Sequence, residues 1–187
     1  MSLNKYTQKR NFSFTNEPQP EIEKSISELI FVVQKHAASH LHYDFRMEME
    51  GVLKSWAIPK GPSMNPADKR LAIMVEDHPY SYKDFEGIIP EGNYGAGRVI
   101  VWDSGTYTLD GDSENIEDSF KEGLIQGHLG FTLRGHKLVG EFTLLKLKGK
   151  QENAWLLIKK NDQFAIDNDI LRQDKSVISN LLLEDLV

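Results

Sequence analysis

Residues that could bind a metal alternate along one short stretch of the chain, SHLHYDFRMEME at residues 39–50. His42, Asp44 and Arg46 stand at every second position of this stretch. The positions between and beside them are apolar: Leu41, Tyr43, Phe45 and Met47. Residues two apart in a β-strand point to the same face of the strand. The stretch therefore predicts a strand with a histidine, a carboxylate and an arginine on one face and core residues on the other.

A second histidine, His36, ends the preceding apolar run at residues 29–36. If this run forms a hairpin with residues 41–49, His36 lies beside His42, and two imidazoles meet the carboxylate of Asp44. Such a set leaves coordination positions open for water or substrate, and it suits Mn, Fe(II) or Zn without choosing among them. We predict a catalytic metal site here. The alternative is an amphipathic strand whose polar face meets water.

Positively charged residues surround this predicted site. Arg46 lies on the same strand face, and Lys54, Lys60 and Arg70 lie on or between the strands that follow. Fixed cations beside a divalent metal suit phosphoryl oxygens, which gain negative charge in the transition state. Each cation also has a simpler interpretation as a solvated side chain, which we favour for Lys54. The substrate class predicted from these charges is a phosphate ester.

The other histidines carry weaker signals. His78 precedes Pro79 and is expected in an extended loop, where it could orient a phosphate, protonate a leaving oxygen, or serve structure alone. His40 falls off the metal face and is expected in the hairpin loop. His128 and His136 have no supporting neighbours in the sequence and are interpreted as structural.

Composition limits the kind of protein that can hold such a site. The chain has 187 residues, 40% of them hydrophobic and 27% charged, which predicts one folded domain with no membrane span and a cytoplasmic location. It has no cysteine, so a thiolate zinc site is excluded. The net charge is −6, but residues 1–83 hold 11 Lys and Arg against 10 Asp and Glu, whereas residues 84–187 hold 11 against 18. A local anion site is therefore permitted, and a broad DNA-coating surface is not.

Apolar runs with a period of two dominate the chain and predict a mainly β fold. The predicted strands are residues 29–36, 41–49, 52–58, 70–76, 98–103, 105–109, 128–135, 137–148 and 154–160. Residues 114–125 predict a helix. The glycine-rich residues 86–97 predict turns, and the tail at 169–187 is expected to be partly helical. A small antiparallel β-barrel of about eight strands with a few short flanking helices is the expected architecture.

Two long motif blocks carry a family resemblance. FVVQKHAASHLHYDFRMEMEGVLKSWAIPKGPS and KRLAIMVEDHPYSYKDFEGIIPEGNYGAGRVIVWDSGTY resemble the 3′-phosphoesterase domain of bacterial and archaeal DNA ligase D. The resemblance extends from the KRNF segment to AWLLIKK, which is most of the chain. No polymerase or ligase module accompanies it, so we expect a stand-alone member that is a monomer. We expect an irregular N-terminal arm at 1–28, with a short helical turn at 21–28, followed by one barrel domain at 29–187.

The resemblance implies a manganese-dependent enzyme of DNA repair by non-homologous end joining. It implies removal of a 3′-terminal ribonucleoside from a primer strand, followed by hydrolysis of the remaining 3′-phosphate to a 3′-hydroxyl, and a separate DNA ligase or polymerase as an expected partner. Zn²⁺ or Co²⁺ are alternative metals. The family's metal ligands correspond to His36, His42 and Asp44. Its other functional positions correspond to Arg10, Glu17, Gln34, Arg46, Lys60, Arg70, His78 and Tyr82, with phosphate contacts at Arg46, Lys60, Arg70 and His78.

The chain departs from the family pattern at Asn11, where an aspartate is usual. Asn keeps a hydrogen-bond acceptor and loses the charge. If that aspartate orients a base or a ribose contact, the ribonucleoside-removing step is expected to be weakened more than the phosphate-removing step. Two other functions remain open at this point. One is a non-haem Fe(II) oxygenase, in which His128 or His136 would join His42 and Asp44. The other is a non-catalytic module that binds DNA ends.

Overall fold

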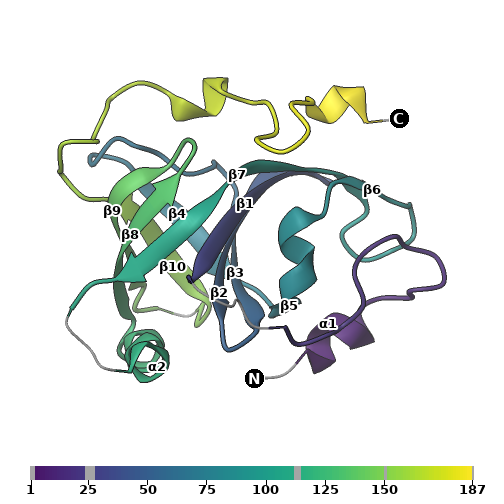
Figure 1. Cartoon of the computed structure of the whole chain (residues 1–187), viewed down its shortest axis with the longest axis horizontal. Helices are drawn as coiled ribbons and strands as arrows, with labels where there is room; N and C mark the ends of the chain where they lie inside the picture. The colour runs from purple at the N-terminus through teal and green to yellow at the C-terminus, as the bar shows by residue number, and fades with distance from the viewer. Residues whose placement is uncertain (1–2, 24–27, 112–114, 150, 187) are drawn as a thin grey trace.

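The fold is a closed antiparallel β-barrel, seen in a computed structural model that describes residues 3–23, 28–111, 115–149 and 151–186 (Figure 1). The strands of these residues are β1 (Ile30–Ala37), β2 (Leu41–Met49), β3 (Val52–Ile58), β4 (Lys69–Met74), β5 (His78–Pro79), β6 (Gly87–Ile89), β7 (Gly97–Leu109), β8 (His128–Gly135), β9 (Val139–Lys146) and β10 (Ala154–Lys159). The helices are α1 (Asn4–Gln8) and α2 (Ile116–Gln126), with short 3₁₀ turns at Tyr80–Asp84, Ile170–Arg172 and Leu183–Asp185.

Eight of the strands form the ring of the barrel. Their order is β1-β2-β3-β4-β10-β9-β8-β7, and β7 pairs with β1 to close the ring. The short strands β5 and β6 lie outside the ring, on β3 and β7. The predicted mainly β barrel is therefore confirmed, and closure leaves the ring strands without a free edge.

The first hairpin of the barrel has the predicted pairing. β1 and β2 pair antiparallel with His36 opposite His42 and Gln34 opposite Asp44. β2 then turns into β3 at Glu50 and Gly51, which have φ values of 52° and 78°. Positive φ at both central residues is the type I′ geometry that matches the twist of paired strands. The turn fixes the register between β2 and β3, and that register opposes Arg46 to Ser55.

Alternation along β2 separates two environments. Tyr43, Phe45 and Met47 point into the barrel and are buried, as predicted, and the Phe45 ring stacks on Phe131 with centroids 5.8 Å apart. The opposite face of β2 lies outside the ring, yet Arg46 is only 3% exposed. The simple interpretation of that face as one open to water is therefore wrong.

The N-terminal segment covers this outer face. Tyr6 of α1 packs with Val32, Leu53 and Tyr82 in a second apolar cluster outside the ring. Figure 1 shows the purple arm passing close to β5 and to the loop after β6. Regular helix in this arm occurs at α1; residues 21–23 are not helical, and the rest of the turn predicted at 21–28 falls mostly outside the described residues. Burial of Tyr6 explains why the segment folds against the barrel.

Other boundaries differ from the sequence prediction in small ways. Residues 98–103 and 105–109 form the single strand β7, which continues through Ser104. Gly105 lies so close to the Arg134 carbonyl that a side chain would not fit there. Part of the glycine-rich segment predicted as turns is strand β6, which pairs with the start of β7. His78 lies in the two-residue strand β5, opposite Leu53, and not in a loop. None of the described helices has the length and apolar character needed to cross a bilayer.

Candidate active site

The three predicted metal ligands converge on the outer face of the first hairpin. Among the described residues, His36, His42 and Asp44 offer ligand atoms that all lie within 4.8 Å of one another. Asp44 Oδ2 is 3.5 Å from His36 Nδ1 and 3.6 Å from His42 Nε2. The cross-strand pairing of His36 with His42 and the two-residue step to Asp44 produce this convergence.

Backbone carbonyls fix the orientation of both imidazoles. His36 Nε2 is 2.8 Å from the Gly95 carbonyl oxygen, and His42 Nδ1 is 3.0 Å from the His40 carbonyl oxygen. A carbonyl only accepts, so each of these outer nitrogens carries a proton. The inner nitrogens face the carboxylate of Asp44, where each can either donate a proton to that carboxylate or offer a lone pair to a metal. A metal would take the place of those protons, and histidines held by carbonyls are typical of metal sites.

Charge at the site favours a cation in the same way. Burial disfavours the ionised form of Asp44, but the Arg46 charge and the hydrogen bonds of both imidazoles outweigh it and hold the pKa of this carboxyl well below 3.8. Burial also opposes the charged form of His42, but the hydrogen bond and charge of Asp44 raise the pKa of that imidazole above 6.5. Asp44 is thus ionised at neutral pH, and a proton on His42 competes with a metal.

Arg46 is held in one position by three partners. Its Nε donates to Gln34 Oε1 at 2.8 Å, its Nη1 to Ser55 Oγ at 2.8 Å, and its Nη2 to Asp44 Oδ2 at 3.2 Å. The amide of Gln34 is anchored in turn, because its Nε2 donates to the carbonyls of Tyr82 and Phe85. Gln34 therefore positions Arg46, which is a fixed positive charge beside the predicted metal ligands.

His78 is buried as a neutral ring. Its Nδ1 is 2.9 Å from the Glu76 carbonyl oxygen, which only accepts, and its Nε2 is 3.3 Å from Arg10 Nη2, which only donates. The proton therefore belongs on Nδ1. Burial and the nearby charges of Arg46 and Arg10 hold the pKa of His78 well below 6.5. In this state His78 cannot protonate a leaving oxygen from Nε2.

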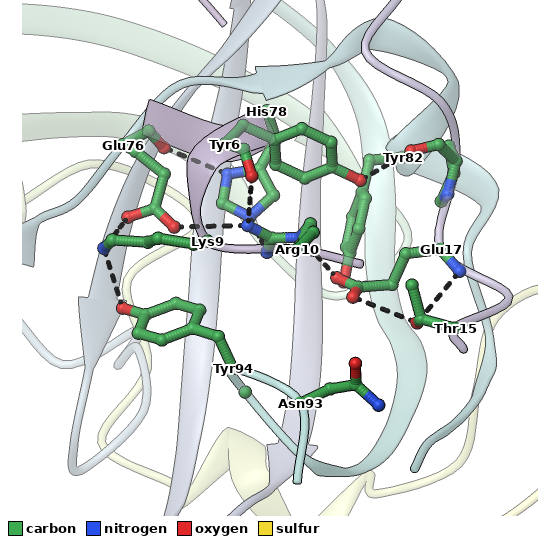
Figure 2. Close-up of polar contacts among 12 residues, drawn as sticks. Tyr6, Lys9, Arg10, Thr15, Glu17, Glu76, His78, Tyr82, Asn93 and Tyr94 are labelled. Atoms are coloured by element: carbon green, nitrogen blue, oxygen red, sulfur yellow. Dashed lines mark hydrogen bonds and ion pairs between the residues drawn. The ribbon is translucent and has the colours of Figure 1, made fainter. Parts of the chain in front are cut away.

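The arm delivers Arg10 and Glu17 to the site (Figure 2). Arg10 Nε donates to Glu17 Oε1 at 2.9 Å, and the Tyr82 hydroxyl donates to the same oxygen at 2.8 Å. The Arg10 guanidinium lies 3.9 Å from the ring centroid of Tyr6. Burial and the charge of Glu17 raise the pKa of Tyr82 well above 10.0, so its phenol stays a donor. Arg10 is thereby fixed at the wall of the site.

A hollow opens at this cluster. Its wall includes Arg10, His36, His42, Asp44, Arg46, His78 and Tyr82. These residues were predicted from sequence as one site, and the structure brings them together. Glu17 and Gln34 lie behind this wall and contact it. A hollow lined by three predicted metal ligands and two arginines can hold a phosphate group and its ester oxygen.

Lys60 and Arg70 do not line this hollow. They line a separate one together with Pro59, Asp68, Lys69 and Leu71. Alternation along β4 explains the position of Arg70: Ile73 pairs with Ala57, which lines the hollow, whereas Arg70 lies three residues away on the other face. Its Nη2 donates to Asp68, and among the described residues its buried Nε has no partner. Phosphate contacts by Lys60 and Arg70 stay a prediction.

The remaining candidates lie away from the predicted metal ligands. His128 is exposed at the start of β8, and the backbone nitrogen of His136 donates to Asp103 across a turn. Neither histidine lines the hollow, so nothing in the described chain provides the ligand set expected for the oxygenase. Lys54 is paired with Asp77 at 2.7 Å. Asn11 is exposed, and its side chain accepts from the Ser13 backbone within the arm.

Several contributors to the site were missed by sequence reasoning. Glu76 pairs with Lys9 at 3.0 Å and Arg10 at 3.5 Å, and its carbonyl holds His78. Gly95 holds His36 through its carbonyl, and backbone groups leave no signal in a sequence. Tyr6 was also missed; it lies four residues before Arg10, but Arg10 is beyond the end of α1 at Gln8, so helical spacing does not pair the two.

Comparison with known proteins agrees with the resemblance in the sequence. The family model of the DNA Ligase D 3'-phosphoesterase domain matches residues 34–146. "Multifunctional non-homologous end joining protein LigD" of Pseudomonas aeruginosa is 52% identical over 97% of this chain. "Multifunctional non-homologous end joining DNA repair protein LigD" of Mycobacterium tuberculosis is 41% identical over 89% of it. The matches cover 22% and 21% of these relatives, so the chain spans about a fifth of their length.

Proposed function

We propose that the chain, which belongs to the DNA ligase D 3′-phosphoesterase domain family, hydrolyses phosphate esters at the 3′ ends of nucleic acid strands. The proposed reactions are removal of a 3′-terminal ribonucleoside, which leaves a 3′-phosphate, and hydrolysis of that phosphate to a 3′-hydroxyl. The observation that carries the proposal is the meeting of three lone-pair donors with a fixed arginine in one hollow. The same proposal includes a ligase or polymerase partner and action as a monomer in the cytoplasm. It also includes the division into an arm at 1–28 and a barrel domain at 29–187.

His36, His42 and Asp44 would hold a divalent metal, which we propose to be Mn²⁺. When bound, such an ion polarises a phosphoryl oxygen and lowers the pKa of water. The protein supplies the rest. Arg46 neutralises charge on the phosphoryl oxygens, because its three hydrogen bonds prevent it from reorienting away from the hollow. The described site residues include no cysteine, and no serine nucleophile motif was found, so water is the proposed nucleophile.

We assign positioning roles to the arm and to His78. The neutral Nε2 of His78 accepts from Arg10, so His78 directs the Arg10 guanidinium to the wall of the hollow. Glu17 accepts from Nε of the same guanidinium and from the hydroxyl of Tyr82. This arrangement predicts that loss of His78 or Glu17 weakens phosphate positioning and leaves metal binding intact.

A labelled primer tests the proposed function. A 5′-labelled primer strand with one terminal ribonucleotide, paired to a template, is incubated with manganese and resolved by size and by end group. We expect shortening by one nucleoside and a final 3′-hydroxyl. Because of Asn11, we expect a primer that already ends in a 3′-phosphate to react faster than the ribonucleotide-ended primer. A primer that stays unchanged at every manganese concentration would remove the hydrolase assignment.

A further inference from the structure

An exposed aromatic ring stands at the rim of the proposed active site. Among the large hydrophobic side chains of the described residues, three aromatic ones are more than a third exposed: Phe14, Tyr94 and Phe164. Tyr94, at 49% exposure, is the one of these that lines the hollow shared by the metal ligands and His78. The catalytic roles assigned above do not use it.

Tyr94 is held in place by the N-terminal arm. Lys9 of the arm donates to the Tyr94 hydroxyl at 3.1 Å, and its Nζ lies 4.2 Å from the ring centroid (Figure 2). Lys9 is itself fixed by an ion pair with Glu76. The next residue after Tyr94 is Gly95, whose carbonyl oxygen holds His36. One short segment therefore fixes both the ring and a proposed metal ligand.

The chemistry of a nucleic acid end fits this placement. Arg10 and His78 line the hollow and are buried, whereas Tyr94 is half exposed, so a terminal phosphate beside Arg46 and the proposed metal ligands would place its nucleoside on the open side of the hollow, toward Tyr94. A nucleobase has an apolar π face, and stacking on an aromatic side chain binds it without regard to sequence. We propose that Tyr94 stacks on the nucleobase at the 3′ end of the substrate strand; this rests on the proposed function and adds a binding residue for the nucleoside.

The test pairs removal of the ring with removal of the base. Two fluorescent primers end in a 3′-phosphate, and one of them lacks the terminal base. Their dissociation constants are measured by fluorescence anisotropy for the wild type, Tyr94→Ala, Tyr94→Phe and the control Phe164→Ala, an exposed aromatic that does not line the hollow. Turnover with manganese is measured in parallel.

We expect Tyr94→Ala to weaken binding of the base-bearing primer by about tenfold, which is the effect of one stacked base. Binding of the primer that lacks the base should be almost unchanged. Tyr94→Phe should bind like the wild type, because it keeps the ring and loses only the bond to Lys9. Phe164→Ala should also match the wild type. An equal loss on both primers, or a Tyr94→Phe protein as weak as Tyr94→Ala, would overturn the stacking role.

The same measurements separate this inference from the proposed function. If the wild type binds both primers but turns over neither with manganese, the hydrolase assignment fails, and the stacking role still stands or falls on the binding constants. If turnover occurs, and Tyr94→Ala weakens binding of both primers by the same factor, the hydrolase assignment stands and Tyr94 has no stacking role. If the wild type binds neither primer, both are wrong.

Discussion

The His42→Ala protein should show no 3′-end hydrolysis at any manganese concentration up to about millimolar. His42 supplies one of three lone pairs that face a common point, and Asp44 and His36 alone leave an incomplete set. Loss of a residue that merely orients a ligand costs about 10- to 100-fold in metal affinity or activity, so loss of a ligand should cost at least about a hundredfold. The measurement is turnover of the labelled primer across a manganese series.

The matched control is His40→Ala, which makes the same chemical change two residues away. His40 is exposed, and its contact with His42 is through its backbone carbonyl, which alanine retains. We expect activity close to that of the wild type. Near-normal turnover in His42→Ala, with the same manganese dependence as the control, would contradict the metal site. Thermal unfolding of both variants without metal shows whether either change unfolds the protein.

Removing Arg46 should be the most damaging single change to stability at the site. Arg46→Ala deletes hydrogen bonds to Gln34, Ser55 and Asp44, and leaves the buried carboxylate of Asp44 without its largest compensating charge. Breaking one partner of a buried ion pair typically costs about 3–5 kcal/mol, and we expect a loss of this size in the free energy of unfolding. Activity should fall with it. The measurements are denaturant unfolding and primer turnover.

The loss of stability in Arg46→Ala should depend on pH and should be smaller in acid. The pKa of Asp44 in the folded protein lies below its ordinary value of 3.8, so the stability that it contributes is present above that value and is lost as the pH falls toward the folded-state pKa. The difference in stability between the wild type and Arg46→Ala should therefore be full at neutral pH and narrow below pH 3.8.

Two further variants separate charge from geometry. Arg46→Lys keeps the charge but cannot reach three acceptors at once, so we expect partial recovery of stability and little recovery of activity. Lys160→Ala breaks an exposed pair with Asp110 at 2.8 Å and should cost no more than about 1 kcal/mol. An Arg46→Ala protein as stable as Lys160→Ala would show that the arginine network is not a structural requirement.

The convergence of His36, His42 and Asp44 could be predicted from the sequence alone because strands have a short, strict period. His42 and Asp44 share a face by the two-residue step, and a loop of three residues between β1 and β2 fixes His36 opposite His42. The barrel also followed from period-two runs and turn residues, since antiparallel neighbours joined by tight turns must pair. The helix predicted at 114–125 is present as α2 at Ile116–Gln126.

Other features depend on contacts between distant parts of the chain, which local patterns do not encode. Burial of the outer face of β2 requires the arm, which docks through Tyr6 in the outer apolar cluster and through Arg10 onto Glu76 and His78, more than 60 positions away in the chain. Arg70 was grouped with the phosphate site from its charge, whereas its face on β4 depends on the register with β3. The contribution of Gly95 is a backbone carbonyl and is independent of residue type.

The central claim is that His36, His42 and Asp44 bind one divalent metal. The most direct measurement is anomalous scattering from crystals of the wild type grown with manganese, collected at the manganese absorption edge. The account predicts one strong peak at about 2.0–2.2 Å from His36 Nδ1, His42 Nε2 and Asp44 Oδ2. A well-ordered peak elsewhere, with these three side chains pointing apart, would contradict it.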